Sequence, residues 1–227
     1  MIPWVHLDTA TVPDGGGELK LMQRGHEFSI MSGAIELMNS RLSGSEKALA
    51  TLACERLSDR PKAHLLVGGF GMGFTLRAAL EALPPTGRVT VGELVPAVIA
   101  WARGPMAHIS GECLQDPRLT LVEGDVTALI RSAPAGTYDA ILLDVDNGPE
   151  GLSRPANDQL YNPEGLAAAR RALTAGGILA VWSSAPDDGF TRRLRRAGYQ
   201  VEEVKVRATG GKRGARHVIW LATKPTA

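Results

Sequence analysis

The chain is poor in cysteine and in net charge. Its two cysteines, Cys54 and Cys113, lie far apart and form no Cys-x-x-Cys motif, so neither a disulfide framework nor a cysteine metal site is expected. The five histidines have no mutual spacing that is typical of metal ligands. With a formal net charge of +1, the chain has no large electrostatic footprint for nucleic acid or an anionic membrane. The composition therefore predicts reduced thiols, no bound metal and no nucleic-acid partner.

Long apolar runs are also missing. No segment approaches the roughly 18 to 20 apolar residues that a membrane-spanning helix needs. The first residues, MIPWVHLDTATVPDGGG, have no basic segment followed by an apolar one, so no signal peptide is indicated. We therefore expect a cytoplasmic protein without membrane contact. A hydrophobic fraction of 44% is nevertheless ample for one sizeable core.

Short apolar runs alternate with amphipathic stretches after Pro61. Five such strand-helix units in succession are typical of an α/β fold, a Rossmann-like doubly wound sheet that is mostly parallel. Two further strand-like runs follow, and the turn-rich link TGGKRG between them predicts a C-terminal antiparallel hairpin, which brings the expected sheet to seven strands. The seven runs are HLLVGG, RVTVGEL, RLTLVEG, YDAILLDV, GILAVWSS, YQVEEVKVRA and ARHVIWLATK.

The N-terminal part of the chain has a different pattern. Residues 18–37 alternate apolar and polar positions around Arg24-Gly25, which predicts a short β-hairpin, and the first dozen residues have the composition of a linker. A helix is expected to follow, with Ser43 or Ser45 as its N-cap. We therefore divide the chain into an N-terminal β-hairpin extension, residues 1–42, and a Rossmann-like catalytic domain, residues 43–227.

A glycine-rich loop follows the first strand of the predicted sheet. Gly69, Gly71 and Gly73 come directly after HLLVG and directly before a helical pattern. Glycines let the backbone approach a ligand closely, so this arrangement is typical of a nucleotide-binding loop. The motif alone is weak, because many folds carry glycines at such a turn. Whether the loop binds a nucleotide therefore depends on the residues that follow the other strands.

Acidic residues end the next three strands, at the edge where ligands bind in such sheets. Glu93 is expected to accept hydrogen bonds from both ribose hydroxyls of an adenosine, with Leu94 beside it. Asp125 follows Gly124 and could accept from the adenine amino group while Val126 packs on the ring. A helix N-cap is an alternative role for Asp125, and the two can coexist. Asp144 is expected to face the reaction cavity, where a carboxylate can hold or abstract a proton.

Taken together, the motifs LLVGGFGMG, VTVGELVPAVIAWAR, DPRLTLVEGD, YDAILLDVDNGP and ALTAGGIL resemble those of class I S-adenosylmethionine-dependent transferases. The resemblance is closer to the spermidine synthase family within that class and covers roughly residues 18 to 185. It implies an S-adenosyl cosubstrate and, since family members are commonly dimers or tetramers, a homodimer. The glycine spacing and the GGIL turn favour this class over a nicotinamide-dependent enzyme.

The chain departs from the family at the polyamine site. Spermidine synthases carry an aspartate inside the glycine loop, where this chain has Gly71-Met72. They also carry a Tyr-His pair, and neither residue occurs in the corresponding segment 39–46. Of the two carboxylates in the family's gate loop, Asp144 matches the first and Asp146 only loosely replaces the second. The adenosine site is thus expected to be intact and the polyamine site dismantled.

These departures favour transfer of a methyl group from S-adenosylmethionine to a small-molecule acceptor. An aminopropyltransferase that uses decarboxylated S-adenosylmethionine remains the alternative, as does a non-catalytic S-adenosyl-binding protein. Residues 146–162 are expected to form a lid. Arg154 would suit an acceptor with a carboxylate or phosphate if it faces inward, and a surface arginine is the alternative. The candidate catalytic residues are therefore Asp144, Asp146, Arg154 and Tyr161.

Overall fold

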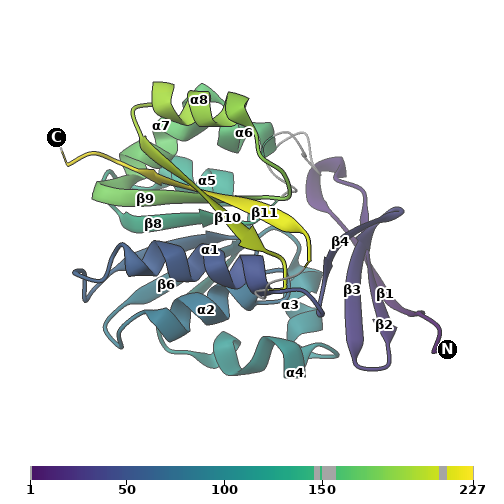
Figure 1. Cartoon of the computed structure of the whole chain (residues 1–227). Coiled ribbons are helices and arrows are strands. Elements are labelled where there is room, and N and C mark those ends of the chain that lie inside the picture. Colours follow the sequence, from purple (N-terminus) through teal and green to yellow (C-terminus); the bar gives the residue numbers. More distant parts are fainter. Residues whose placement is uncertain (1, 146–148, 150–156, 210–213, 227) are drawn as a thin grey trace.

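A seven-stranded sheet forms the centre of the protein (Figure 1). The computed structural model describes residues 2–145, 149, 157–209 and 214–226. The strand order is β10-β11-β9-β8-β5-β6-β7, and the five strands from β9 to β7 run parallel to one another. β11 is antiparallel to both β9 and β10. The strands are β5 (His64–Gly68), β6 (Arg88–Glu93), β7 (Leu119–Glu123), β8 (Tyr138–Leu143), β9 (Leu173–Ser183), β10 (Gln200–Arg207) and β11 (Arg216–Thr223).

The predicted α/β fold with its C-terminal hairpin is thereby confirmed. Helices cover both faces of the sheet, because each parallel crossover leaves a helix on one face or the other (Figure 1). One layer contains α1 (Gly44–Glu55), α2 (Phe74–Ala82), α3 (Pro96–Arg103) and α4 (Ala107–Ser110), and the other contains α5 (Val126–Ser132), α6 (Asp158–Tyr161), α7 (Pro163–Ala172) and α8 (Asp188–Arg196).

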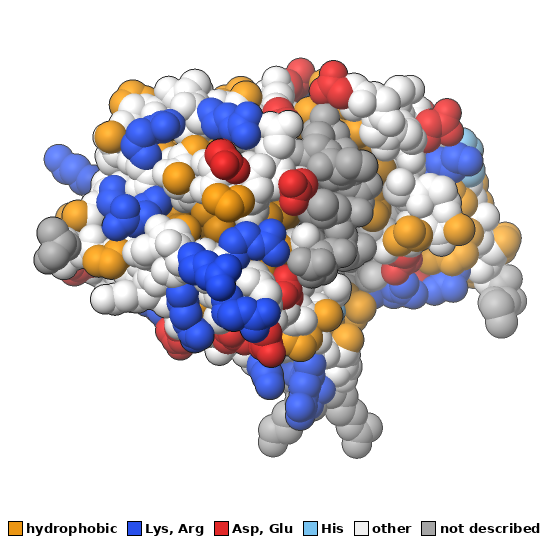
Figure 2. Space-filling model, turned by 90° about the horizontal axis from the view of Figure 1, so that it is seen from above, with side chains coloured by type: hydrophobic (Ala, Val, Ile, Leu, Met, Phe, Trp, Pro, Cys, Tyr) orange, Lys and Arg blue, Asp and Glu red, His pale blue; other side chains and the backbone are white. Residues whose placement is uncertain are grey.

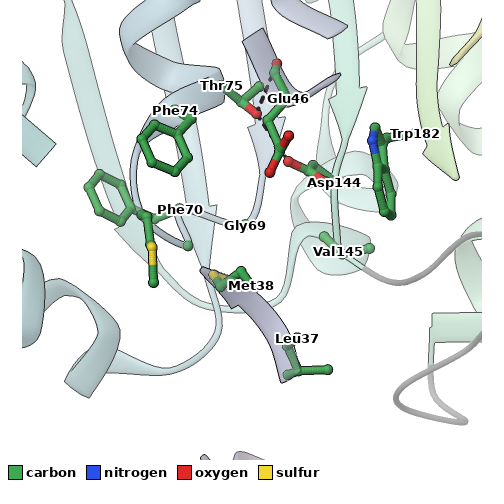
Figure 3. A pocket seen from close by; sticks show the side chains of 12 residues that line it. Leu37, Met38, Glu46, Gly69, Phe70, Phe74, Thr75, Asp144, Val145 and Trp182 are labelled. Atoms are coloured by element: carbon green, nitrogen blue, oxygen red, sulfur yellow. Dashed lines mark hydrogen bonds between the residues drawn. The ribbon is translucent and has the colours of Figure 1, made fainter. Parts of the chain in front are cut away.

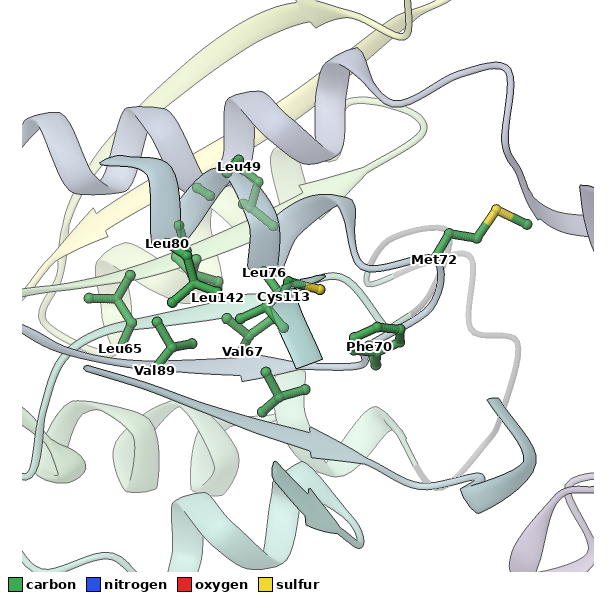
Figure 4. Packing of buried hydrophobic residues seen from close by; sticks show 14 of the residues in the cluster. Leu49, Leu65, Val67, Phe70, Met72, Leu76, Leu80, Val89, Cys113 and Leu142 are labelled. Carbon is green, nitrogen blue, oxygen red and sulfur yellow. The ribbon is translucent and has the colours of Figure 1, made fainter. Parts of the chain in front are cut away.

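Successive side chains of the strands enter two separate hydrophobic cores. Leu65 and Val67 of β5 belong to the core on the α1–α2 side, whereas Leu66 between them belongs to the core on the opposite side. This alternation is the period-two pattern of a strand that is buried on both faces. Figure 4 shows the first core, with Leu49 of α1 packed above the strands and Val89 of β6 within it. The two cores hold the strands in place, and the carboxyl ends of these strands form the cavities described in the next section.

A second, four-stranded antiparallel sheet precedes the main domain. Its strand order is β1-β2-β3-β4. The sequence predicted only a short β-hairpin here, so the observed sheet is larger than expected. β1 arises from the dozen residues interpreted as a linker, and its pattern VHLDTAT is almost wholly exposed, with one buried alanine. The strand therefore carries little of the alternation on which a strand prediction depends. The strands are β1 (Val5–Thr11), β2 (Glu18–Arg24), β3 (Glu27–Ser32) and β4 (Ile35–Asn39).

This small sheet packs against the main domain. Leu21, Phe28 and Ile30 are buried in the same core cluster as Leu49 of α1. The indole nitrogen of Trp101 donates a hydrogen bond of 2.7 Å to Asp8 of β1. The sheet thus lies across the carboxyl ends of the main strands (Figure 1). β4 ends at Asn39 and α1 begins at Gly44, and the division at residue 42 stays a prediction.

The net charge conceals a local concentration of basic side chains. Helices α7 and α8 carry six arginines between them. On the face seen in Figure 2, several basic side chains lie close together with acidic ones beside them. The absence of a nucleic-acid partner stays a prediction. In the described part of the chain, no helix is both long and apolar enough to cross a membrane.

Candidate active site

The glycine loop lies between β5 and α2. Gly69, Gly71 and Gly73 all have positive φ angles, of +83°, +56° and +81°, a region that residues with a Cβ rarely adopt. A Cβ at Gly69 would lie 3.1 Å from the backbone oxygen of Asp144, and one at Gly71 would lie 3.0 Å from the sulfur of Met38. The loop therefore needs glycine both for its turn and for its neighbours. It brings β5, β8 and β4 together at one point.

Glu93 holds the glycine loop from the end of β6. Its two carboxylate oxygens accept hydrogen bonds of 2.8 Å, one from the backbone N–H of Phe70 and one from that of Val95. Only 7% of the residue is exposed. Burial raises the pKa of this carboxyl, and the surrounding backbone amides oppose that rise. Each carboxylate oxygen has a further lone pair, so Glu93 retains capacity to accept from a ligand.

A cavity of about 150 Å³ opens beside Glu93. Nearly all of the residues that the sequence predicted for an adenosine ligand line this cavity. The exception is Gly73, which occupies the N-cap position of α2. Asp125 also has the expected capping role, because it accepts a hydrogen bond of 2.7 Å from the backbone N–H of Thr127. We call this space the nucleoside cleft. The predicted residues along it are Gly69, Gly71, Glu93, Leu94, Gly124, Asp125, Val126 and Asp144.

A second cavity, of about 90 Å³, adjoins the nucleoside cleft. The two share Gly69, Gly71, Met38 and Asp144 in their walls, so a ligand in one lies against a ligand in the other. We call the second cavity the acceptor pocket, after the role that we propose for it below. Figure 3 shows that aromatic side chains and two carboxylates surround it. The aromatic residues along its wall are Phe70, Phe74 and Trp182.

Asp144 and Glu46 face each other across the acceptor pocket (Figure 3). Asp144 follows β8 directly, and Glu46 lies in the first turn of α1. Thr75 of α2 donates a hydrogen bond of 3.1 Å to Asp144 and approaches the backbone oxygen of Glu46 at 3.4 Å. Three segments far apart in the sequence thus converge here. Two carboxylates close together in an apolar pocket repel each other when both are ionised.

The surroundings of Asp144 raise its pKa to about 7. Burial is the main cause, the negative charge of Glu46 adds to it, and the hydrogen bond from Thr75 opposes it. Burial likewise raises the pKa of Glu46, against the lowering effect of a hydrogen bond from Ser45. A carboxyl whose pKa lies near neutrality is suited to exchange a proton with a bound ligand. Asp144 thus lies at a cavity, as the sequence predicted, and its role in a reaction stays a prediction.

Glu46 is the residue that the sequence analysis missed. It stands in the segment 39–46 that was compared with the Tyr-His pair and found to lack both residues, so its carboxylate was passed over. The segment itself carried the signal, because an acid in the first turn of a helix ahead of the glycine loop can face that loop. The hydroxyl of Ser45 donates to Glu46, and neither Ser43 nor Ser45 makes a side-chain cap of α1. Ser43 therefore occupies the expected N-cap position of α1, but its side chain makes no capping hydrogen bond.

Of the three remaining predicted catalytic residues, only Tyr161 lies in the described part of the chain, and it does not join this pocket. Tyr161 is 1% exposed, and its ring packs edge-on against Phe190 at a centroid distance of 5.7 Å. It ends helix α6, and its apolar ring completes the core beneath α8, so it does not line either cavity. Asp146 and Arg154 lie outside the described residues. Among those that are described, no group of His, Cys, Asp and Glu is arranged to hold a metal ion.

The raised pKa of Asp144 makes stability depend on pH. Between the ordinary range of an aspartate and pH 7, the unfolded chain loses a proton that the folded protein keeps, so stability falls as pH rises. Asp144→Asn removes this pH-dependent loss of stability. It should raise the melting temperature at pH 8 by ~5 °C and raise it much less at pH 4. Thermal unfolding across this pH range measures the difference. The exposed Asp59→Asn variant is the control, and an equal gain at both pH values would contradict the prediction.

A doubly wound sheet, a glycine loop and an acid at the end of the second strand define a Rossmann-type nucleoside-binding fold. A family model described as S-adenosyl-L-methionine-dependent methyltransferase matches residues 102–217, slightly more than half of the chain. The chain belongs to this family. The spermidine synthase-like fold that the motifs predicted is confirmed by the solved structures described below.

Curated relatives fall into two activities. Putrescine N-methyltransferase 4 of Nicotiana tabacum is 36% identical over 119 residues, which are 52% of this chain and 29% of the relative. Polyamine aminopropyltransferase of Mycobacterium tuberculosis is 33% identical over 160 residues, 66% of this chain and 29% of the relative. The matched region thus spans less than a third of these relatives.

Solved structures of the same fold include spermidine synthases. The crystal structure of spermidine synthase from Thermotoga maritima has a TM-score of 0.75 and 17% sequence identity, and the match covers 98% of this chain and 73% of that one. A spermidine synthase in complex with the transition state analogue AdoDATO gives the same TM-score at 18% identity, with the same coverage. These neighbours confirm the fold, and at this identity they say nothing more about the activity.

Proposed function

We propose that the protein is an S-adenosylmethionine-dependent methyltransferase whose acceptor is a small cationic amine. The observation that carries this proposal is the pair Asp144 and Glu46 in an aromatic pocket next to the nucleoside cleft. An ammonium between two carboxylates relieves their repulsion. The aromatic rings of Phe74 and Trp182 in the pocket wall add a favourable environment for a cation, and the ammonium of Lys47 lies 6.0 Å from the centroid of the Phe74 ring. In this proposal Asp144 is the first carboxylate of the site, and Glu46 is the second, a place for which the sequence offered only Asp146.

The nucleoside cleft fits the cosubstrate on observations of this chain alone. Glu93 retains lone pairs for two ribose hydroxyls, and Asp125 lies further along the same cleft. Gly69 and Gly71 leave their backbone open, since no Cβ fills the space beside Asp144 and Met38. A bound S-adenosylmethionine would supply an electrophilic methyl group on its sulfonium. The junction of the two cavities would be the place where that methyl meets an acceptor.

The chain's own part in the reaction is to bind, orient and deprotonate the acceptor. An amine arrives largely as an ammonium, which has no lone pair with which to attack. Asp144, with a pKa of about 7, accepts the proton, and the freed lone pair of the nitrogen can then form the new bond to carbon as the carbon–sulfur bond breaks. Glu46 holds the positive charge that the nitrogen regains as it is methylated, or the charge that the second ammonium of a diamine keeps. The apolar walls exclude water and align the two reactants.

Methyl transfer is favoured over aminopropyl transfer by the glycine loop. A decarboxylated cosubstrate presents an ammonium where S-adenosylmethionine also presents a carboxylate. The loop residues from Gly69 to Gly73 carry no acid that could neutralise such an ammonium. The relationship to aminopropyltransferases keeps that activity as the second candidate. Glu46 and Asp144 would serve the amine acceptor in either case.

The acceptor charge can be tested at Glu46. Glu46→Gln keeps the size of the side chain and removes its charge, so the KM for a cationic amine should rise by about tenfold, the loss of one charge-assisted contact. Steady-state kinetics with a series of diamines measures the change. The control is Glu55→Gln, an exposed residue on the same helix. An unchanged KM in Glu46→Gln would remove Glu46 from the acceptor site.

A further inference from the structure

We propose that His217 and Ser45 position Glu46 for the acceptor, an inference that rests on the proposed amine methyltransferase function. The Ser45 hydroxyl donates a hydrogen bond of 2.7 Å to Oε2 of Glu46. Nδ1 of His217 lies 2.9 Å from the same hydroxyl oxygen. His217 belongs to β11, and the other two residues open α1. The C-terminal hairpin therefore reaches the acceptor pocket through a hydrogen-bonded chain.

The direction of this chain follows from its donors. A serine hydroxyl has one proton, and that proton goes to Glu46 when the carboxylate is ionised. Nδ1 of His217 must then be the protonated nitrogen and donate to the oxygen of Ser45. Ser45 is fully buried, so water does not compete for its hydroxyl. Both donors point toward Glu46, and both favour the ionised form of its carboxylate.

This arrangement offsets the forces that act against a charged Glu46. Burial and the facing carboxyl of Asp144 disfavour the charge, and Lys47, an exposed neighbour on α1, is the cation that the structure places beside it. Burial lowers the pKa of His217, so the imidazole is neutral at pH 7 and acts by its N–H dipole. The hydrogen-bonded chain from His217 through Ser45 keeps the carboxylate of Glu46 ionised and fixes this side chain at the pocket wall.

His217 also supports the aromatic wall. Its ring meets Trp182 edge-on, with centroids 4.8 Å apart and an angle of 80° between the rings. The indole nitrogen of Trp182 is buried without a hydrogen-bond partner among the described residues, so His217 orients this ring by packing alone. One residue of β11 therefore contacts the aromatic side of the pocket directly and reaches its acidic side through Ser45. That position suits a residue that sets the shape of the site without touching the substrate.

Steady-state kinetics of three variants test the role of the hydrogen-bonded chain from His217 through Ser45 to Glu46. His217→Leu and Ser45→Ala break it, and each should raise the KM for a cationic amine by about tenfold while kcat and the affinity for S-adenosylmethionine stay within about twofold. His217→Asn keeps an N–H near the position of Nδ1 and should restore most of the affinity. Glu202→Gln is the matched control. It breaks a 2.6 Å ion pair between Glu202 of β10 and Arg56, the C-cap residue of α1, and so loosens the end of the same helix without touching Glu46.

A titration without substrate separates this inference from the proposed function. Carbon NMR of the Glu46 carboxyl should show its titration at higher pH in His217→Leu and Ser45→Ala than in the native protein. That result, with no amine methylated, would uphold the positioning role and overturn the proposed acceptor. Methylated amines with neither a KM change nor a titration shift in His217→Leu would overturn the inference. A KM increase in Glu202→Gln equal to that in His217→Leu would overturn it as well.

Discussion

Asp144→Asn should lower kcat for amine methylation by about 10²–10⁴-fold, the usual contribution of a positioned general base. Asparagine preserves the shape of the side chain and can accept the hydrogen bond from Thr75. It cannot take a proton from an ammonium. Single-turnover measurements with saturating S-adenosylmethionine report the chemical step without product release.

The pH dependence gives this prediction a second criterion. Because Asp144 has a pKa of about 7 and acts in its ionised form, kcat/KM of the native protein should rise with pH through about 7. The Asn variant should lack this limb and recover activity only where the amine itself loses its proton in solution. Full activity of the variant at pH 8 would contradict the assignment of Asp144 as the base.

Glu93→Ala should weaken binding of S-adenosylmethionine by about tenfold or more. The expected loss is that of the hydrogen bonds from the ribose hydroxyls to a carboxylate, each charge-assisted. The variant also leaves the backbone N–H groups of Phe70 and Val95 without their present partner. Part of the effect therefore comes from a looser glycine loop. Isothermal titration calorimetry on the folded variant measures the total.

Two comparisons separate the two contributions of Glu93. Glu93→Gln keeps an acceptor for one of the backbone N–H groups, so it should bind more tightly than the alanine variant and less tightly than the native protein. Glu123→Ala is the matched control, because Glu123 pairs with Glu93 at the end of the neighbouring strand and is exposed. Unchanged affinity in Glu93→Ala would remove Glu93 from the cosubstrate site.

The sequence predicted the main sheet well because its strands carry strong local signals. Runs such as HLLVG and YDAILL are buried on both faces, and each is followed by a glycine or an acid at the ligand edge. The strand ends could thus be located before any tertiary contact was known. The nucleoside cleft is built almost wholly from those ends, which is why eight of its predicted residues line one cavity.

The acceptor pocket could not be predicted in the same way. It joins Glu46 of α1, Thr75 of α2 and Trp182 of β9, and no local pattern relates these positions. Tyr161 shows the converse, since a polar aromatic in a presumed lid segment belongs to a core that only the tertiary fold defines. β1 was missed because its exposed polar pattern resembles a linker. Contacts between distant segments decide each of these cases.

The most direct test of the account is the product formed from an amine. The protein is incubated with S-adenosylmethionine or its decarboxylated form and a panel of diamines and monoamines, and the products are identified by mass spectrometry. We predict amines that have gained one methyl group, formed with S-adenosylmethionine only. Aminopropylated amines from the decarboxylated form, or cosubstrate binding with no transfer to any amine, would contradict the proposed function.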